Sequence, residues 1–360
     1  MINSFFTKEQ EWLDKWDVFL QNSERGLYNQ LSDWIKSYEV FGFDYEIFIQ
    51  TKNDIIIGGC GIVIAKFSIF KFYIVPCGPV LDFENENQLD FILQQLKNNA
   101  LKKGCCYFQI SVPKVQNIQP KNDCSINNIQ ESSTYFSGNN GTKFKYVIPL
   151  YGMRLVDLSS KNYDVVFSSF GKNHKRNIIK SQSENLTFKF VTNPNDIETA
   201  YNCFVLNAQD KGYPLRSYKS IQKTLNAYIT KDFAKMGCCY YNDKIVGAIY
   251  VMKCAKRYIY INGGVLKEFQ HLNVSHFLHN YMIQDSLKKG FNYYDVSVGG
   301  SQGVIRFKEG FGSQLYNFIE TKHWILKPFT FKIYLLIEKK IKPYKSKIAD
   351  LLLQFKKIKL

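Results

Sequence analysis

Residues 101–112 of the chain read "LKKGCCYFQISV", and residues 287–298 read "LKKGFNYYDVSV". A second pair of segments keeps the same order, because "NDIIIGG" begins at Asn53 and "NDKIVGA" begins at Asn242. The offsets are 186 and 189 residues, so the two copies stay in near register. Self-similarity at so long a spacing is typical of a duplicated domain and not of a solenoid of short repeats.

Each copy predicts the same series of elements. Long β runs follow the Asn-Asp turn, and an amphipathic helix is expected over residues 87–103 in the first copy and 273–289 in the second. Gly104 and Gly290 follow these helices, at the place where glycine commonly ends a helix. One long helix among mixed strands resembles the acetyltransferase-like (GNAT) fold more than a Rossmann unit. We therefore expect an α+β chain of two tandem acetyltransferase-like domains with mixed β-sheets.

The predicted domain limits follow from the repeat and from composition. We expect a first domain over residues 1–145, a second over residues 146–325 and a basic helical tail over residues 326–360. Residues 119–143 are rich in Asn, Ser and Gly, which predicts an exposed loop near the boundary. From residue 321 onward 11 lysines face two acidic residues, with leucines and isoleucines between them. This pattern predicts contact with a membrane surface, although a helix packed on the second domain explains it nearly as well.

Charge is divided unevenly along the chain. The net charge is +16, yet residues 1–150 carry 14 Lys and Arg against 16 Asp and Glu, whereas residues 151–360 carry 33 against 15. The asymmetry indicates that the second half meets an anionic partner such as nucleic acid, a nucleotide phosphate or a lipid surface. A soluble basic surface with no dedicated partner is the alternative.

Cysteine usage and the N-terminal residues predict a cytoplasmic protein. The nine cysteines include adjacent pairs in β runs but no C-x-x-C, which favours reduced and mostly buried thiols. The N-terminus lacks the apolar core of a signal peptide. The longest apolar run, residues 55–65, is too short to span a bilayer.

Two signatures of other enzyme classes are incomplete. Gly299, Ser301 and Gly303 match G-x-S-x-G, but we expect the following "VIRFKEGFG" not to be a helix, and the order of the later histidine and acid does not fit a serine hydrolase. His271, His276 and His279 lie close together without an H-E-x-x-H pattern. We therefore expect them on the polar face of a helix, with no metal site and no tightly bound cofactor.

The start of the second predicted helix admits two explanations. Acyl-CoA acetyltransferases of similar layout carry Q-x-x-G-x-G/A there, and free backbone N–H groups hold the pyrophosphate. This chain has Gln270, with Asn273 and Ser275 in place of the glycines. Capping of the helix by Asn273 and Ser275 needs no ligand, and we favour it.

Residues 293–314, "YYDVSVGGSQGVIRFKEGFGSQ", combine five glycines with Arg306 and Lys308. We expect a loop in which the glycines let backbone N–H groups approach a substrate closely around Lys308. A glycine-rich turn with one solvated lysine is the alternative.

The repeat, the "GPVLDF" turn at residues 78–83 and the element F-K-x-x-F-G (residues 307–312) together resemble the FemABX family over roughly residues 25–330. The resemblance implies two acetyltransferase-like domains and an aminoacyltransferase of peptidoglycan and cell wall biogenesis. Family members transfer an aminoacyl group from aminoacyl-tRNA to an amine of a nucleotide- or lipid-linked muropeptide. More distant relatives are thought to use acyl-CoA instead.

The resemblance also implies roles for individual residues. Lys308 matches the lysine of the reaction centre, Arg216 an arginine that contacts the diphosphate of the acceptor, and Asp295 the Tyr-Asp strand end. Two acceptor contacts of the family are absent, because Tyr38 stands where a lysine is frequent and Val112 where an aspartate precedes proline.

Aminolysis of an ester or thioester needs an unprotonated amine, a proton relay and donors for the developing oxyanion. Lys308 could supply positive charge, while Asp295 and the tyrosines of residues 258–260 could handle the proton. The predicted catalytic residues are Lys308, Asp295 and Tyr260. The predicted substrate-binding residues are Arg216, Arg306, Tyr258, Phe311, Gly312, Gln270, Asn273 and Ser275.

These observations predict a cytoplasmic FemABX-like N-acyltransferase that modifies an amine of a cell-envelope precursor. We expect aminoacyl-tRNA or acyl-CoA as donor, a nucleotide- or lipid-linked acceptor, and peripheral contact with the inner face of the cell membrane through the tail. One alternative is an acyl-CoA-dependent N-acyltransferase acting on an amino sugar or amino acid. Another is a non-catalytic binder of RNA or anionic membrane.

Overall fold

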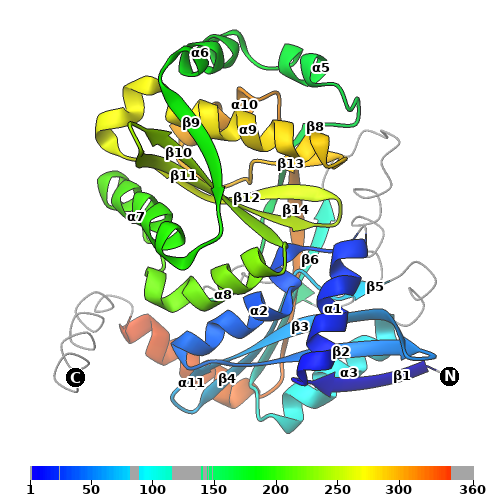
Figure 1. The fold of residues 1–360 in the computed structure, drawn as a ribbon. Coiled ribbons are helices and arrows are strands. Elements are labelled where there is room, and N and C mark those ends of the chain that lie inside the picture. The colour runs from blue at the N-terminus through cyan, green and yellow to red at the C-terminus, as the bar shows by residue number, and fades with distance from the viewer. Residues whose placement is uncertain are drawn as a thin grey trace.

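The chain folds as an α+β protein with two mixed sheets, one above the other in Figure 1. This computed structural model describes residues 2–23, 25–81, 89–115, 139–140, 144, 146–147 and 149–341. The expected loop at residues 119–143 lies outside the described residues, apart from the short strand β7 (Asn139–Asn140). The last part of the expected tail, residues 342–360, also lies outside them.

The first sheet has the order β1-β2-β3-β4-β6-β14. All neighbours are antiparallel except β4 and β6, which run parallel and are joined through α3. Its elements are β1 (Ile2–Thr7), α1 (Gln10–Asn22), α2 (Ser32–Lys36), β2 (Asp44–Lys52), β3 (Ile55–Phe67), β4 (Phe70–Pro76), β5 (Val80–Leu81), α3 (Leu89–Lys102) and β6 (Tyr107–Val115).

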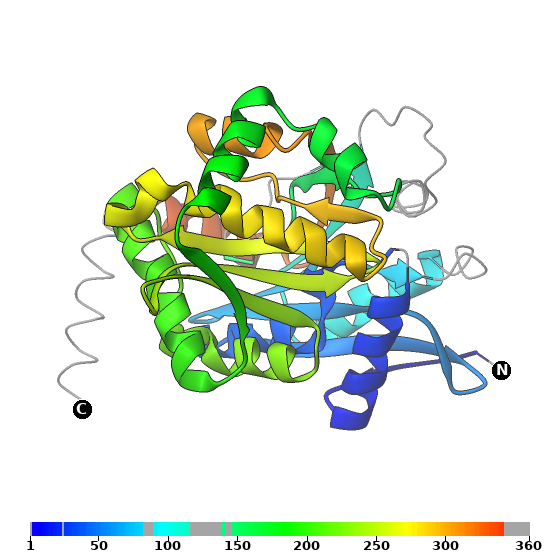
Figure 2. The same ribbon diagram turned by 45° about the horizontal axis from the view of Figure 1, so that its top comes forward.

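The second sheet has the order β14-β8-β13-β12-β11-β10-β9, with β12 and β13 parallel and joined through α9. Figure 2 shows α9 lying along the strands of this sheet. The elements are β8 (Gly152–Asp157), α5 (Tyr163–Ser168), α6 (Lys172–Ser183), β9 (Leu186–Val191), α7 (Pro194–Lys211), α8 (Tyr218–Thr230), β10 (Ala234–Tyr241), β11 (Lys244–Cys254), β12 (Arg257–Val265), α9 (Val274–Lys288), β13 (Tyr293–Asp295), α10 (Gln302–Glu309), β14 (Gln314–Ile325) and α11 (Pro328–Ile341).

The repeat in the sequence is visible in the structure. The Asn-Asp turns at Asn53 and Asn242 both take left-handed backbone conformations, with φ of 52° and 46° at the asparagines, as tight hairpin turns require. Gly104 and Gly290 follow α3 and α9 with φ of 79° and 75°, which favours glycine. The predicted α+β class with mixed sheets is confirmed.

Strand β14 belongs to both sheets. Its residues Gln314–Asn317 pair with β8, whereas Phe318–Ile325 pair with β6. The last strand of the first sheet therefore comes from the part of the chain assigned to the second domain. The division at residue 145 stays a prediction.

Polar contacts also join the two halves. The side chain of Gln21 donates to the carbonyl of Lys253 at 2.7 Å, and the buried Arg257 donates to the carbonyl of Gly26 at 2.6 Å. Lys231 at the end of α8 pairs with Asp14 and Asp33 at 3.1 and 3.3 Å. The halves are held by specific hydrogen bonds as well as by apolar packing.

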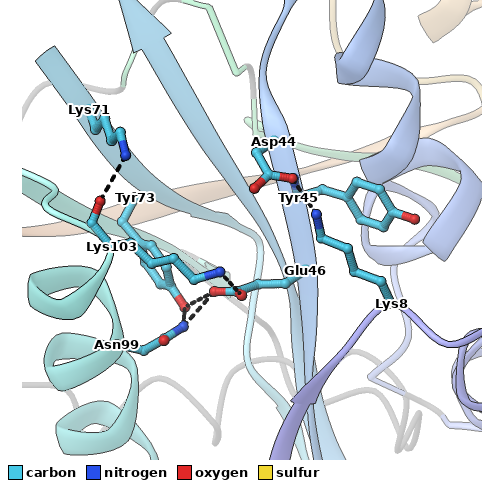
Figure 3. A network of polar contacts seen from close by, with 8 residues as sticks. All are labelled: Lys8, Asp44, Tyr45, Glu46, Lys71, Tyr73, Asn99 and Lys103. Carbon is cyan, nitrogen blue, oxygen red and sulfur yellow. Dashed lines mark hydrogen bonds and ion pairs between the residues drawn. The ribbon is translucent and has the colours of Figure 1, made fainter. Parts of the chain in front are cut away.

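A buried carboxylate holds α3 on the first sheet (Figure 3). Glu46 of β2 is 4% exposed and accepts hydrogen bonds from the Tyr73 hydroxyl at 3.0 Å and from the amide of Asn99. Lys103 forms an ion pair with the same carboxylate at 2.9 Å. Because a buried charge is costly without partners, this network stabilises the position of α3.

The first part of the expected tail is helix α11. It packs on the first sheet, since the ring of Tyr334 lies 4.6 Å from Phe72 and that of Phe331 lies 5.0 Å from Tyr107. The alternative expectation, packing on the second domain, was wrong for this helix. In the part of the chain that the structure describes, no helix is both long and apolar enough to cross a bilayer, and the eight cysteines are buried with free thiols.

Candidate functional site

The candidate site lies where the two parallel strands of the second sheet part. Arg257–Ile259 of β12 pair with Tyr293–Asp295 of β13. There β13 ends, whereas β12 continues to Val265. Sites in sheets with parallel strands form where neighbouring strands diverge at their carboxyl ends. Here the chain turns at Ser297, with φ of 62°, and enters helix α10.

Lys308 lies on α10 and not in a loop. The prediction that "VIRFKEGFG" is not helical was wrong, because α10 spans Gln302–Glu309. Gly300 and Gly312, which have φ of 136° and 69°, flank this helix, so the flexible positions lie outside it. A helix does follow Ser301, but within the described residues no histidine is hydrogen-bonded to its hydroxyl.

The Lys308 side chain is buried, with 4% of its surface exposed. Its ammonium group donates to the carbonyls of Ser297 at 3.0 Å and Gly299 at 2.7 Å. Burial lowers the pKa of Lys308 to about 8; Asp295 opposes this effect and the nearby Arg154 adds to it. The lysine is therefore mostly charged at neutral pH but releases its proton far more readily than a solvated lysine.

Asp295 positions the loop that Lys308 contacts. One of its carboxylate oxygens accepts hydrogen bonds from the backbone N–H groups of Arg154 at 3.1 Å and Ser297 at 2.7 Å. Burial raises the pKa of Asp295, and the two hydrogen bonds partly offset that effect. Because Ser297 also supplies a carbonyl to the ammonium group, Asp295 and Lys308 bind the same turn.

The two predicted tyrosines have different surroundings. The ring of Tyr260 lies under the Lys308 ammonium group, 5.6 Å from its centre, and burial raises its pKa, so the hydroxyl stays protonated. Tyr258 is fully buried and its hydroxyl lies 2.6 Å from the carboxylate of Asp285 on α9. The structure brings Tyr260 to Lys308 and gives Tyr258 another partner.

A cluster of histidines packs behind α10. The ring centres of His174 and His276 lie 4.7 Å apart. The ring centre of Phe307 lies 5.4 Å from that of His174, 5.0 Å from that of His276 and 5.4 Å from that of His279. Burial lowers the pKa of His276 to about 4 and that of His279 to about 3. The expectation that the α9 histidines form a polar face was wrong for His279, which is 5% exposed. All three are neutral at physiological pH, and they hold α10 against α6 and α9.

His174 requires a glycine directly after α10. A side chain at Gly310 would place its Cβ 1.9 Å from the His174 ring, and the ring also lies within hydrogen-bonding distance of the Phe307 carbonyl, at 2.7 Å. At Gly312 a Cβ would lie 2.8 Å from the Ser169 hydroxyl. The glycines on this side of the helix permit close packing, and Phe311 between them is fully buried. We assign Phe311 and Gly312 to packing, and their predicted substrate contacts stay untested.

A basic pocket of about 610 Å³ is lined by residues of α6, α9 and α10. Two exposed cations, Lys172 and Arg306, line it together with the edge of Phe307. It also includes the first turn of α6, where backbone N–H groups have no partner within the helix. The lining residues are Gly171, Lys172, Asn173, His174, Asn177, His276, Gly303, Arg306, Phe307 and Gly310.

The start of α9 lies beside this pocket, because His276, the third residue of this helix, lines it. Asn273 precedes the helix with φ of 57°, a left-handed conformation, and its side chain makes no capping hydrogen bond. Ser275 lies in the first turn and Gln270 in the short 3₁₀ segment Lys267–Leu272. Side-chain capping was therefore wrong for Asn273 and stays a prediction for Ser275. Asparagine is suited to position 273 because it tolerates the backbone conformation that glycine would otherwise supply.

Arg216 lies at the junction of the two halves, away from α10. Its guanidinium donates to the hydroxyl and carbonyl of Ser37, both at 3.0 Å, and to the carbonyl of Ser220 at 3.1 Å. The ring of Phe41 lies 5.2 Å from it. Arg216 thus already links the start of α8 to the first domain, and its contact with a diphosphate stays a prediction.

Arg154 was missed from the sequence. It is 5% exposed, lies on β8 and pairs with Glu309 of α10 at 3.4 Å. The backbone N–H of Arg154 donates to the carboxylate of Asp295, and the charge of its guanidinium lowers the pKa of Lys308. A single arginine in a short strand carries no motif, so only the pairing of β8 with β13 reveals it.

The fold and this site define an acyltransferase of the acetyltransferase-like class. A model of the FemAB family matches residues 12–237, and a model of an acetyltransferase (GNAT) domain matches residues 168–309. The chain belongs to the FemAB family. This membership favours a transferase over the alternative of a non-catalytic binder.

Solved structures share the fold at low identity. A crystal structure of FemX is 12% identical with a TM-score of 0.73, over 91% of this chain and 99% of that one. The C-terminal domain of a putative lysylphosphatidylglycerol synthetase from Agrobacterium fabrum is 12% identical with a TM-score of 0.55, over 87% and 90%. A tandem GNAT protein from the clavulanic acid biosynthesis pathway is 9% identical with a TM-score of 0.53, over 91% and 99%. No curated protein sequence matches the chain.

Proposed function

We propose that this protein transfers an aminoacyl group from aminoacyl-tRNA to an amine of a nucleotide- or lipid-linked cell-envelope precursor, on the cytoplasmic side of the membrane. The observation that carries the proposal is the buried Lys308, held by α10 at the point where β12 and β13 part. FemAB membership supports the same reaction class.

The proposed chemistry is aminolysis of the aminoacyl ester. The acceptor amine attacks the carbonyl carbon and the C–N bond forms. The ester C–O bond then breaks, and the terminal ribose oxygen leaves as a hydroxyl after taking up the proton that the amine loses. Among the described residues two main-chain carbonyls accept from the Lys308 ammonium group, which has three N–H donors. The remaining donor could stabilise the oxyanion, and a pKa of about 8 suits proton transfer to the leaving oxygen near neutral pH.

The basic pocket beside Phe307 would receive the phosphates at the end of the donor. Lys172 and Arg306 supply charge, and the first turn of α6 supplies backbone N–H groups. Arg216, at the junction of the halves, would face the acceptor, although Tyr38 and Val112 replace two family contacts. We infer an acceptor that differs from the usual muropeptide in the groups that face Tyr38 and Val112, while its diphosphate is still bound by Arg216.

A second donor, acyl-CoA, has one observation in its favour. Asn273 takes a left-handed conformation at the start of α9, so the backbone there adopts a geometry that glycine would provide. The N–H groups of the first turn of α9 could then hold a pyrophosphate. An acceptor such as an amino sugar or amino acid would accompany this donor.

The test is mass spectrometry of products formed from mixtures of charged tRNA and acyl-CoA with candidate amine acceptors. We expect aminoacyl products that require tRNA and that are lost in Lys308→Met but not in Lys52→Met, which changes an exposed lysine of β2. Products from acyl-CoA alone would assign the second donor. Equal rates in both variants would remove Lys308 from the reaction.

A further inference from the structure

Helix α11 has an inner face that is packed and an outer face that is not. On the inner face Phe331 and Tyr334 contact Tyr107 and Phe72 of the first sheet. On the outer face large apolar side chains meet solvent, with 78% of Phe329 and 57% of Leu336 exposed. Leu335 and Ile337 are 46% and 39% exposed. Exposed apolar residues gathered on one element are typical of a contact surface.

Helical spacing places lysines among these apolar side chains. Phe329, Lys332 and Leu336 follow one another at i, i+3 and i+7, and Leu335 and Lys339 are four residues apart beside them, so the five share one face. Both lysines are exposed. Long lysine side chains can cover apolar surface while the ammonium group reaches polar headgroups. We call these five residues the α11 face.

The charge of the chain decides which occupant fits the α11 face. Another copy of this protein would bring a second net charge of +16 to it. The residues after α11 add six lysines and one aspartate. Like charges therefore oppose both a second copy of the protein and the residues after α11 as occupants of this face. A flat anionic surface, in contrast, attracts each lysine by about 1 kcal/mol.

We propose that the α11 face lies on the surface of an anionic phospholipid bilayer, with Phe329 and Leu336 inserted at the level of the headgroups. At 1.5 Å per residue the 14 residues of α11 extend about 21 Å, less than the ~30 Å of a hydrocarbon core. The described residues of α11 would therefore lie in the interface. The proposal does not depend on the acyl-transfer reaction.

The turn between β3 and β4 adds a neighbouring exposed residue. The ring of Phe70 lies 5.6 Å from that of Tyr334, which places the start of β4 beside α11. Ile69 immediately before it is 76% exposed. Figure 1 shows β4 and α11 together at the end of the molecule away from the second sheet. Contact through α11 would leave the basic pocket beside α10, at the opposite end, open to solvent.

The test is co-sedimentation of the full chain with vesicles of phosphatidylcholine, with or without about three parts in ten of phosphatidylglycerol. We expect binding to the anionic vesicles only. The double variant Phe329→Glu/Leu336→Glu should reduce it at least about tenfold. The matched control Ile55→Glu changes a 70% exposed isoleucine in the β2–β3 hairpin and should bind as the wild type does.

Further variants separate charge from apolar contact. The variant Lys332→Gln/Lys339→Gln should weaken binding to anionic vesicles and remove part of its salt dependence. The melting curves of both double variants should match that of the wild type, because the side chains changed at positions 329, 332, 336 and 339 are all exposed. No binding, equal binding to neutral vesicles, or full binding by the Phe329→Glu/Leu336→Glu variant would each overturn the proposal. A lipid-free dimer that this variant abolishes would assign the face to a second copy. Sedimentation needs no substrate, so its outcome is independent of the proposed transferase activity.

Discussion

Replacing Lys308 by methionine should separate stability from activity. The substitution keeps the length and the apolar stem of the side chain but removes its charge and two hydrogen bonds. A lysine whose pKa falls from 10.5 to about 8 is destabilised in its charged form by about 3 kcal/mol. Methionine removes that cost, whereas each carbonyl left without a donor costs about 1–3 kcal/mol. We expect the free energy of unfolding at pH 7 to fall by no more than about 3 kcal/mol, the upper limit of two unpaired carbonyls less the cost relieved.

Catalysis should respond far more strongly. A cation that stabilises charge in the transition state typically contributes about 10²–10³ to the rate, so kcat should fall by that factor in Lys308→Met. Urea unfolding and steady-state kinetics on the same preparations give both quantities. A variant that folds normally and keeps full kcat would refute the assignment of Lys308 to the reaction, and a variant that unfolds would show a structural lysine.

The pH dependence gives an independent check. Between about pH 8 and pH 10.5 the unfolded lysine holds a proton that the folded lysine has released, so the unfolded state binds more protons there. The stability of the wild type relative to Lys308→Met should therefore rise with pH across this window, by up to about 3 kcal/mol. A flat difference would mean that Lys308 has an ordinary pKa and is hydrated.

Three other predictions concern the surroundings of the site and the first sheet. Arg154→Met should raise the pKa of Lys308, because Arg154 contributes to lowering it, and the alkaline limb of the pH–rate profile should move to higher pH; an unmoved limb would assign Arg154 to packing alone. His276 and His279 are neutral in the folded protein, so the free energy of unfolding should fall as pH drops from about 6.5 to about 4, and urea titrations that give a constant value would contradict this. Glu46→Ala removes the acceptor shared by α3 and the sheet and should destabilise the protein by about 2–4 kcal/mol. The lower value is expected because Lys103, the partner of Glu46, is 38% exposed. Thermal melting measures the loss of stability, and an unchanged melting temperature would show that water replaces the carboxylate.

The duplication could be read from the sequence because its signals are local. Asn-Asp turns, glycines after helices and apolar periodicity depend on the backbone conformation of a few neighbouring residues. They placed α3 and α9 to within two residues of their observed ends. The strand shared by both sheets could not be read in this way, since the pairing of β14 with β6 joins residues more than two hundred positions apart.

Helix α10 was missed although its sequence contained a sufficient signal. Val304, Phe307 and Lys308 stand at i, i+3 and i+4, which is helical spacing, but the surrounding glycines drew the prediction toward a loop. The buried lysine obscured the pattern further, because lysine rarely occupies a core position. His174 and Arg154 were missed for another reason: each becomes part of the site only through tertiary packing against α10.

The strand β14 also has a consequence for how the protein is made. Residues 2–115 emerge from the ribosome long before Phe318–Ile325, which supply the strand that covers one edge of β6. Until then the first sheet exposes the unpaired backbone groups of β6, and an open strand edge favours pairing with other chains. We expect the nascent first half to depend on chaperones until synthesis is nearly complete, and fragments that stop before residue 314 to aggregate.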